Sequence, residues 1–138
     1  MLNIKSFHCF LESNKDKFPN FKKFDISGFT VIVGKDAKSN DYITFQMASD
    51  DDIWMHVKGH PGSHVVIKLT EHSNTKETSL PTTEVLREAA SLAKKNSKAN
   101  KEPKVTVVWC KRKYVKKDSG MNDGQVRVDY KNSHEIQI

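Results

Sequence analysis

The chain has little cysteine and no long hydrophobic run. Its 138 residues contain two cysteines, Cys9 and Cys110, and no C-x-x-C pair, which favours free thiols in a reducing cytoplasm over a disulfide framework. The opening stretch MLNIKSFHCFLESNKDKF carries three lysines, and its apolar run is too short for an export signal or a membrane span. We therefore expect a cytoplasmic protein with no membrane partner.

Sequence signatures of several enzyme classes are also missing. The chain has no nucleophile elbow and no phosphate-cradling loop of the type G-x-x-x-x-G-K-[ST]. No other group of residues completes a recognisable mechanism. We expect a protein that is not an enzyme and needs no cofactor.

Positive charge is in excess, and the excess lies in the second half of the chain. The formal net charge is +6, and residues 87–131 hold 13 lysines and arginines against 5 aspartates and glutamates. Such a field attracts polyanions such as nucleic acid, ribosomal RNA or an anionic membrane face. A run of charge is also often just a solvated surface, so charge alone does not identify a partner.

The length is that of one ordinary domain, and no internal repeat or low-complexity tract divides it. Residues 1–20 are polar, show no clear period and are interpreted as an N-terminal extension of a domain at 21–138. At the start of that domain, FKKFDISGFTVIVG predicts a β-hairpin that turns at Ser27 and Gly28.

The middle of the chain predicts a short helix and two neighbouring strands. The stretch YITFQMAS fits a helix begun by Asn40 or Asp41, or else a third strand, and we favour the helix. DIWMHVKG then alternates apolar and other residues, and GSHVVIKL follows after a turn at residues 60–62. We expect these two strands to pair.

The clearest helix follows Pro81. Thr82 is placed to cap it, and an apolar stripe at helical spacing consists of Val85, Leu86, Ala89, Leu92 and Ala93. The β-like runs KVTVVWC, KYVKK, QVRVDY and HEIQI complete the chain. The sequence therefore predicts a single α+β domain with a mixed, mostly antiparallel β-sheet, one main helix and one shorter helix.

Three histidines, His56, His60 and His64, recur at intervals of four and could be metal ligands. On a strand, however, residues four apart lie about 13 Å from each other, too far for one ion. His56 and His64 can face each other across a hairpin, with His60 at its tip. We therefore expect no metal site, although Asp52 and His56 remain a conceivable acid–base pair.

Three spaced motifs carry a resemblance to a known family. The chain resembles the NFACT-R domain, the RNA-binding module of the fibronectin-binding-protein-A-like family, in which a G-[KR]-x-x-x-x-N-[DE] turn precedes D-x-W-x-H and then P-G-S-H-V. The matching residues are Gly34, Lys35, Asn40, Asp41, Asp52, Trp54, His56, Pro61, Gly62, Ser63, His64 and Val65. KYVKKDSGMNDGQVRV is similar to a later family segment, but Asp118 stands where proline is usual, and Asn122-Asp123 where Lys-Pro is common.

The resemblance implies an RNA-binding module of ribosome-associated quality-control factors. The expected partner is RNA, either tRNA or rRNA, and the large ribosomal subunit is a further candidate. Longer members of the family carry additional domains for which 138 residues leave no room, so RNA binding is expected here without the elongating function of those members.

We expect the RNA-binding residues to come from three segments. Lysines contact phosphates, neutral histidines can hydrogen-bond a phosphate or a 2′-hydroxyl, and an exposed aromatic ring can stack on a base. If CKRKYVKK is a strand, Arg112, Tyr114 and Lys116 share one face, which mixes cations with an aromatic ring. The full set is Lys35, Lys38, Asn40, Trp54, His56, His64, Lys111, Arg112, Lys113, Tyr114, Lys116 and Lys117.

Each of these residues also has a purely structural interpretation. Gly34 and Asn40 fit turn and cap geometry, Trp54 fits a core, and the histidines fit a braced hairpin. Two other functions stay open at this point. One is a metal-assisted hydrolase built from the Asp and His cluster at residues 50–64, and the other is a protein-interaction domain on the ribosome.

Overall fold

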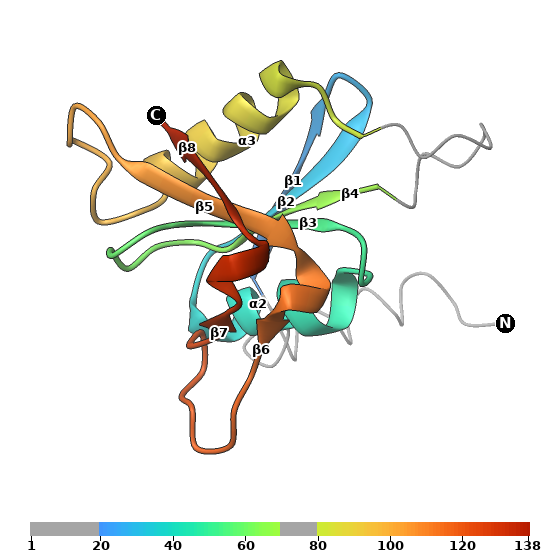
Figure 1. The fold of residues 1–138 in the computed structure, drawn as a ribbon, viewed down its shortest axis with the longest axis vertical. Helices are drawn as coiled ribbons and strands as arrows, with labels where there is room; N and C mark the ends of the chain where they lie inside the picture. The colour runs from blue at the N-terminus through green and yellow to red at the C-terminus, as the bar shows by residue number, and fades with distance from the viewer. Residues whose placement is uncertain (1–19, 70–79) are drawn as a thin grey trace, which may run out of the picture.

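A six-stranded antiparallel sheet forms the centre of the computed structural model, which describes residues 20–69 and 80–138 (Figure 1). Its strand order is β1-β2-β4-β3-β5-β8, and a separate two-stranded sheet is formed by β6 and β7. The strands are β1 (Phe21–Ile26), β2 (Phe29–Gly34), β3 (Ile53–Val57), β4 (Val65–Lys68), β5 (Thr106–Lys111), β6 (Val115–Lys116), β7 (Arg127–Val128) and β8 (His134–Gln137). The predicted α+β class is confirmed.

The first two strands form the predicted hairpin. Ser27 and Gly28 make the turn with φ angles of 50° and 88°, a left-handed conformation that glycine adopts without strain. The backbone N–H of Gly28 donates to the Asp25 carboxylate at 2.9 Å. This pairing places Gly34, the last residue of β2, beside the turn into the next helix.

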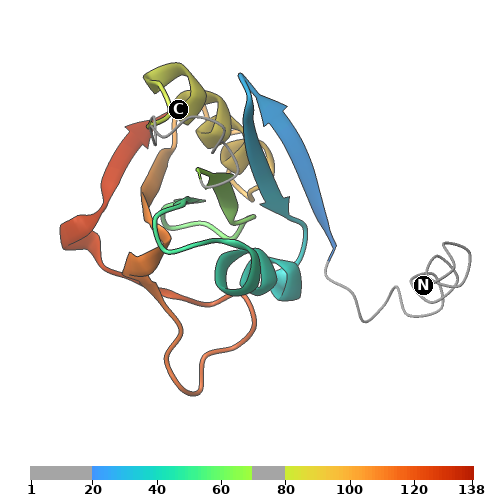
Figure 2. The same cartoon turned by 90° about the vertical axis from the view of Figure 1, so that its right-hand side faces the viewer.

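Helix α3 (Thr83–Lys95) covers one face of the sheet, whereas α2 (Ala37–Tyr42) lies on the opposite side (Figure 2). The Thr82 side chain accepts a hydrogen bond from the backbone N–H of Val85 at 3.3 Å, so the predicted cap is confirmed. The face turned to the sheet contains the buried residues Val85, Ala89, Ala90 and Ala93. Small alanines allow the helix to approach the strands closely.

The shorter helix exists as predicted, but its predicted start was wrong. Helix α2 (Ala37–Tyr42) begins after Asp36, whose side chain accepts from the backbone N–H of Ser39 while the Ser39 hydroxyl accepts from that of Asp36. This capping box satisfies two N–H groups at the helix start and leaves Asn40 free for a different role. A π-helical turn η2 (Ile43–Met47) continues the helix.

Strand β3 separates two apolar clusters, because its side chains alternate between the faces of the sheet. Ile53, Met55 and Val57 pack on the α3 side. Trp54 packs on the other side with residues of β2, β4, β5 and β6. The predicted alternation and the predicted pairing of β3 with β4 are both confirmed.

The expectation that KYVKK is a strand was wrong for most of its length. Strand β5 ends at Lys111, a 3₁₀ turn η4 spans Arg112–Tyr114, and β6 contains only Val115 and Lys116. The backbone N–H of Arg112 donates to the carbonyl of Asp52 at 2.8 Å, which still follows the register of β3 with β5. The N–H of Lys113 donates to the carbonyl of Asp50 at 3.0 Å, one residue out of that register, and here the chain leaves the β5 ladder.

The C-terminal segment contains less strand than predicted. QVRVDY contributes β7 and is followed by a 3₁₀ turn η5 (Tyr130–Asn132), whereas HEIQI forms β8 as expected. No helix within residues 20–69 and 80–138 has the length and apolar character needed to cross a membrane. Cys110 is a free, buried thiol, while the predicted extension at 1–20, including Cys9, lies almost wholly outside the described residues.

Candidate nucleic-acid interface

Asn40 joins the first sequence motif to the third. Its side-chain oxygen accepts from the backbone N–H of His64 at 3.0 Å, and its side-chain nitrogen donates to the carbonyl of Gly62 at 3.4 Å. Gly34 lies against this amide, because a Cβ atom there would collide with the Asn40 oxygen. Asn40 is only 8% exposed, so the role that its contacts support is to brace the two segments.

The second glycine of this region sits against the segment after α3. Gly62 forms an isolated β-bridge with Ser97, and a Cβ on Gly62 would come within 2.7 Å of the Ser97 Cβ. The backbone N–H of Lys98 donates to the carbonyl of Pro61 at 2.9 Å. The P-G-S-H motif therefore fixes Lys98, which follows the helix, beside the turn between β3 and β4.

The histidine pair is formed as predicted. The ring centroids of His56 and His64 lie 5.4 Å apart in an edge-to-face arrangement, while His60 lies exposed in the turn. Burial, followed by the nearby His56, lowers the pKa of His64 to about 3. Burial also lowers the pKa of His56, against an opposing hydrogen bond with the Gly62 backbone. Both rings are therefore neutral at physiological pH.

His64 and Trp54 belong to the interior. The His64 ring nitrogen Nδ1 lies 3.0 Å from the Thr44 hydroxyl, and the side chain is 2% exposed. Trp54 is 1% exposed, so its ring faces are not open for base stacking in this conformation. Its Nε1 atom is buried and has no hydrogen-bond partner among the described residues. The two side chains therefore support the site from the interior of the domain.

Both carboxylate oxygens of Asp52 accept hydrogen bonds from backbone N–H groups. One carboxylate oxygen accepts from the N–H of Leu69, and the other from the N–H of Ser49, each at 2.8 Å. The second oxygen also lies 2.8 Å from the Lys68 ammonium, which in turn donates to the carbonyl of Met47 at 2.7 Å. Asp52 is completely buried, so this network replaces water for both charges.

This network bears on the hydrolase alternative. The Asp52 oxygens are taken up by Leu69, Ser49 and Lys68, so Asp52 is not held as the base partner of His56. Within 20–69 and 80–138, no three His, Cys, Asp or Glu side chains come together in a group that could hold a metal ion. The contacts of Asp52 thus give it a structural role in these residues.

The predicted basic segment is partly neutralised. Arg112 donates through Nε to the carbonyl of Thr44 at 2.9 Å and lies 3.4 Å from an Asp50 oxygen. Lys111 and Lys113 share Asp51 at 3.5 and 3.9 Å. These exposed pairs are weak and leave the two lysines able to exchange partners, whereas the Arg112 guanidinium is held in place.

Tyr114 and Lys117 are held by the surrounding structure, and Lys116 is exposed. The Tyr114 ring is partly buried against the second apolar cluster, with the Lys113 ammonium 5.4 Å from its centroid. The Lys117 ammonium lies 2.7 Å from Asp41 and also donates to the backbone carbonyls of Asn122 and Gln125. The predicted face of Arg112, Tyr114 and Lys116 is thus not a strand face.

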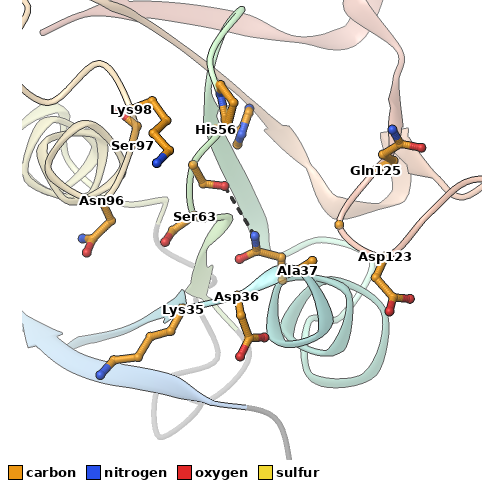
Figure 3. A pocket seen from close by; sticks show the side chains of 14 residues that line it. Lys35, Asp36, Ala37, His56, Ser63, Asn96, Ser97, Lys98, Asp123 and Gln125 are labelled. Carbon is orange, nitrogen blue, oxygen red and sulfur yellow. Dashed lines mark hydrogen bonds between the residues drawn. The ribbon is translucent and has the colours of Figure 1, made fainter.

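Three hollows border the turn between β3 and β4, and further cationic side chains line them. The largest, of about 660 Å³, is bordered by Lys98 on one side and by Asp123 and Gln125 on the other, with Lys35 at its edge (Figure 3). A second hollow of about 610 Å³ and a third of about 450 Å³ both reach Lys58 and His60, and the third also reaches Lys104.

We call the group of Lys35 and Lys98, which border the first hollow, and His60 and Lys104, which border the third, the turn face. None of its three lysines forms an ion pair with another described residue. Lys98 and Lys104 were missed as candidates, because the end of a helix already explains a lysine at 98 and no local pattern marks 104. The departures from the family pattern lie nearby: Asp118 pairs with Arg127 at 2.7 Å, whereas Asp123 borders the largest hollow.

Comparison with known proteins identifies a family that matches this chain. The profile described as "NFACT protein RNA binding domain" matches residues 17–130. The chain is 41% identical over 103 residues to "Rqc2 homolog RqcH" of Bacillus subtilis (strain 168), covering 75% of this chain, and 38% identical over 96 residues to that of Streptococcus suis (strain 05ZYH33), covering 70%. It spans 16% of the length of each of these relatives.

A solved structure agrees with this assignment. The C-terminal part of the fibronectin/fibrinogen-binding protein from Streptococcus suis matches with a TM-score of 0.72 and 32% identity, over 87% of this chain and 44% of that one. The profile match covers the region that contains the three motifs. The chain therefore belongs to the NFACT-R family of RNA-binding domains.

Proposed function

We propose that this domain binds tRNA or rRNA in the cytoplasm without catalysing a reaction, and that the turn face provides its main phosphate contacts. The observation that carries the proposal is that lysines without ion-pair partners among the described residues surround the motif turn of an RNA-binding family. Lysines free of carboxylates release counterions when they meet phosphates, which favours binding to any polyanion.

The residues predicted from the sequence take two roles in this proposal. Lys35, Lys38, His56, Lys111, Lys113 and Lys116 are proposed to contact RNA directly. Asn40, Trp54, His64, Arg112, Tyr114 and Lys117 are proposed to hold those contacts in place, because they are buried or bonded within the domain. We further propose that residues 21–138 form the binding unit, that residues 1–20 extend it, and that the large ribosomal subunit is a partner.

The register of β3 with β5 separates the two groups of cations. Ile53 pairs with Lys111 at one end of these strands, and Val57 pairs with Val107 at the end nearer the β3–β4 turn. Four residues of strand span about 13 Å, so the two groups can be tested independently.

The experiment compares two charge reversals of equal size. One variant carries Lys35→Glu, Lys98→Glu and Lys104→Glu, and the other carries Lys111→Glu, Lys113→Glu and Lys116→Glu. We expect the first to weaken tRNA binding more strongly in fluorescence anisotropy titrations. For the first variant, the plot of log binding constant against log salt concentration should also be less steep by roughly 2–3, close to one unit for each lost contact.

Two outcomes would contradict the proposal. If the unchanged domain binds neither tRNA nor rRNA at low salt, RNA binding itself is wrong for this chain. If the first variant binds as well as the unchanged domain while the second does not, the phosphate contacts lie at the Lys111 end instead.

A further inference from the structure

The second hollow differs from the other two because a tryptophan and a tyrosine line it. It lies on the face of the sheet opposite α3, between β3 and β5 on one side and the segment leading into β7 on the other. Six of its lining residues matter here: Trp54, His56, Val108, Val126, Val128 and Tyr130. Its volume of about 610 Å³ is within the range of roughly 300–1,000 Å³ found for small-ligand sites.

Flat groups lie at both the floor and the mouth of this hollow. The rings of Trp54 and His56 are nearly parallel, with their centroids 6.0 Å apart and 21° between their planes. Tyr130 is 57% exposed, and the Lys58 ammonium lies 5.4 Å from the centroid of its ring. The same ammonium is paired with the Glu135 carboxylate at 2.8 Å, so the feature of the mouth that suits a ligand is the exposed tyrosine ring, which can stack on a flat group.

The polar atoms of the hollow are neutral and incompletely bonded. The Trp54 Nε1–H is buried without a partner among the described residues, so in this conformation it lies behind the surface of the hollow and is not reached by a ligand. The neutral His56 ring uses one nitrogen toward the Gly62 backbone, which leaves the other for a ligand. A free phosphate would meet only the Lys58 ammonium, which is already paired with Glu135 at 2.8 Å, whereas an aliphatic chain would leave the second His56 nitrogen unsatisfied.

We propose that this hollow, the base pocket, takes one unpaired nucleobase of a bound RNA. The inference rests on the proposed function, and it adds the kind of RNA element that the domain prefers. A base offers a flat ring with hydrogen-bond donors and acceptors on its edge, and its phosphates would leave the pocket toward the turn face, because the nearer Lys58 ammonium is already paired with Glu135 at 2.8 Å. The domain should therefore favour RNA with unstacked bases over a continuous duplex.

The chain provides its own reporter for this test. It has two tryptophans, and Trp109 stacks on His134 with ring centroids 4.4 Å apart, outside the base pocket. In ¹H–¹⁵N spectra, we expect the indole N–H signal of Trp54 to shift on titration with at least one of AMP, CMP, GMP and UMP. The Trp109 signal should stay in place, and ribose 5-phosphate, which has no base, should leave both signals unchanged.

A second measurement uses RNA and a matched pair of variants. Val126→Trp fills the pocket from its wall, whereas Leu80→Trp adds the same ring at a site that is 72% exposed. Val126→Trp should weaken binding of an unstructured 12-nucleotide RNA by about tenfold or more and leave binding of a duplex RNA unchanged. Leu80→Trp should bind both RNAs as the unchanged domain does.

The outcomes separate this inference from the proposed function. If the domain binds RNA, but the Trp54 signal stays fixed with all four nucleotides and Val126→Trp binds the single strand normally, the base pocket is wrong and RNA binding stands. If the unchanged domain binds neither RNA, the proposed function fails and this inference fails with it.

Discussion

At the scale of single residues, Lys117 shows that position in a basic run does not determine what a lysine does. Its ammonium reaches Asp41 in α2 at 2.7 Å, the Asn122 carbonyl at 2.6 Å and the Gln125 carbonyl at 3.0 Å. Its side chain is 28% exposed. Lys117 therefore ties the loop at 118–125 to the helix that carries the first motif.

Replacing Lys117 should lower the stability of the fold. Lys117→Gln removes an ion pair and hydrogen bonds from a charged donor, so we expect the free energy of unfolding in urea to fall by about 1–2 kcal/mol. Lys116→Gln is the matched control, because Lys116 is exposed and forms no ion pair with a described residue. Equal stability of the two variants would mean that the tie contributes nothing.

Asn40 likewise shows that residue type and position in a motif do not determine the role of a polar side chain. Its residue type is typical of caps and turns, and the sequence alone could not distinguish a cap from an RNA contact. In the structure, Asp36 provides the cap, and Asn40 instead bonds the His64 backbone across 24 residues. Only the approach of two distant segments decides this role.

At the scale of secondary-structure elements, the Asp52 network connects three segments that bend around the start of β3. It joins the end of η2 through Met47, the end of β4 through Lys68 and Leu69, and the loop at Ser49. The adjacent backbone carbonyl of Asp52 then receives the N–H of Arg112. One buried carboxylate thus supports the position of η4.

Neutralising this carboxylate should be costly. Asp52→Asn leaves the Lys68 ammonium, whose side chain is 7% exposed, without its counter-charge. Removing one partner of a buried ion pair destabilises proteins by roughly 3–5 kcal/mol, and we expect a loss of that order in chemical unfolding. Asp51→Asn, at a neighbouring position whose side chain is 67% exposed, should change stability by no more than about 0.5 kcal/mol. A similar effect of both substitutions would contradict the proposed role of Asp52.

Elements governed by local pattern were predictable, and those governed by distant contacts were not. The α3 stripe, the β1–β2 turn and the alternation in β3 depend on residues within one turn or one strand of each other. The segment 112–114 has a strand-like pattern but forms a 3₁₀ turn, in which the backbone N–H of Lys113 bonds the carbonyl of residue 50, one residue out of the β3–β5 register. No local period encodes such a bond.

At the scale of the whole molecule, buried neutral histidines couple folding to pH. His64 has a pKa of about 3 in the fold against 6.5 in an unfolded chain, so below pH 6.5 the unfolded chain binds a proton that the folded protein does not. Stability is therefore fully present above pH 6.5 and decreases as the pH falls toward 3. The lowered pKa of His56, which faces His64, acts in the same direction.

Unfolding experiments between pH 7 and pH 5 can measure this coupling. We expect the free energy of unfolding to decrease by about 2 kcal/mol over this interval from His64 alone. His64→Gln should flatten this dependence, even if it lowers stability throughout. His60→Gln should leave it intact because His60 is exposed. A pH-independent stability of the unchanged protein over this interval would show that the buried pair does not titrate as described.

By itself, the sequence was sufficient to determine the α+β class, the main helix, the hairpins and the NFACT-R family, because these depend on local periodicity and on motifs readable along the chain. The tertiary structure decided which motif residues brace the fold and which cations stay free. It placed partners around the Lys117 ammonium and brought Lys98 to the motif turn. The physical reason is that a charge stays available to a ligand only where the fold brings no partner close to it, and such partners come from distant parts of the chain.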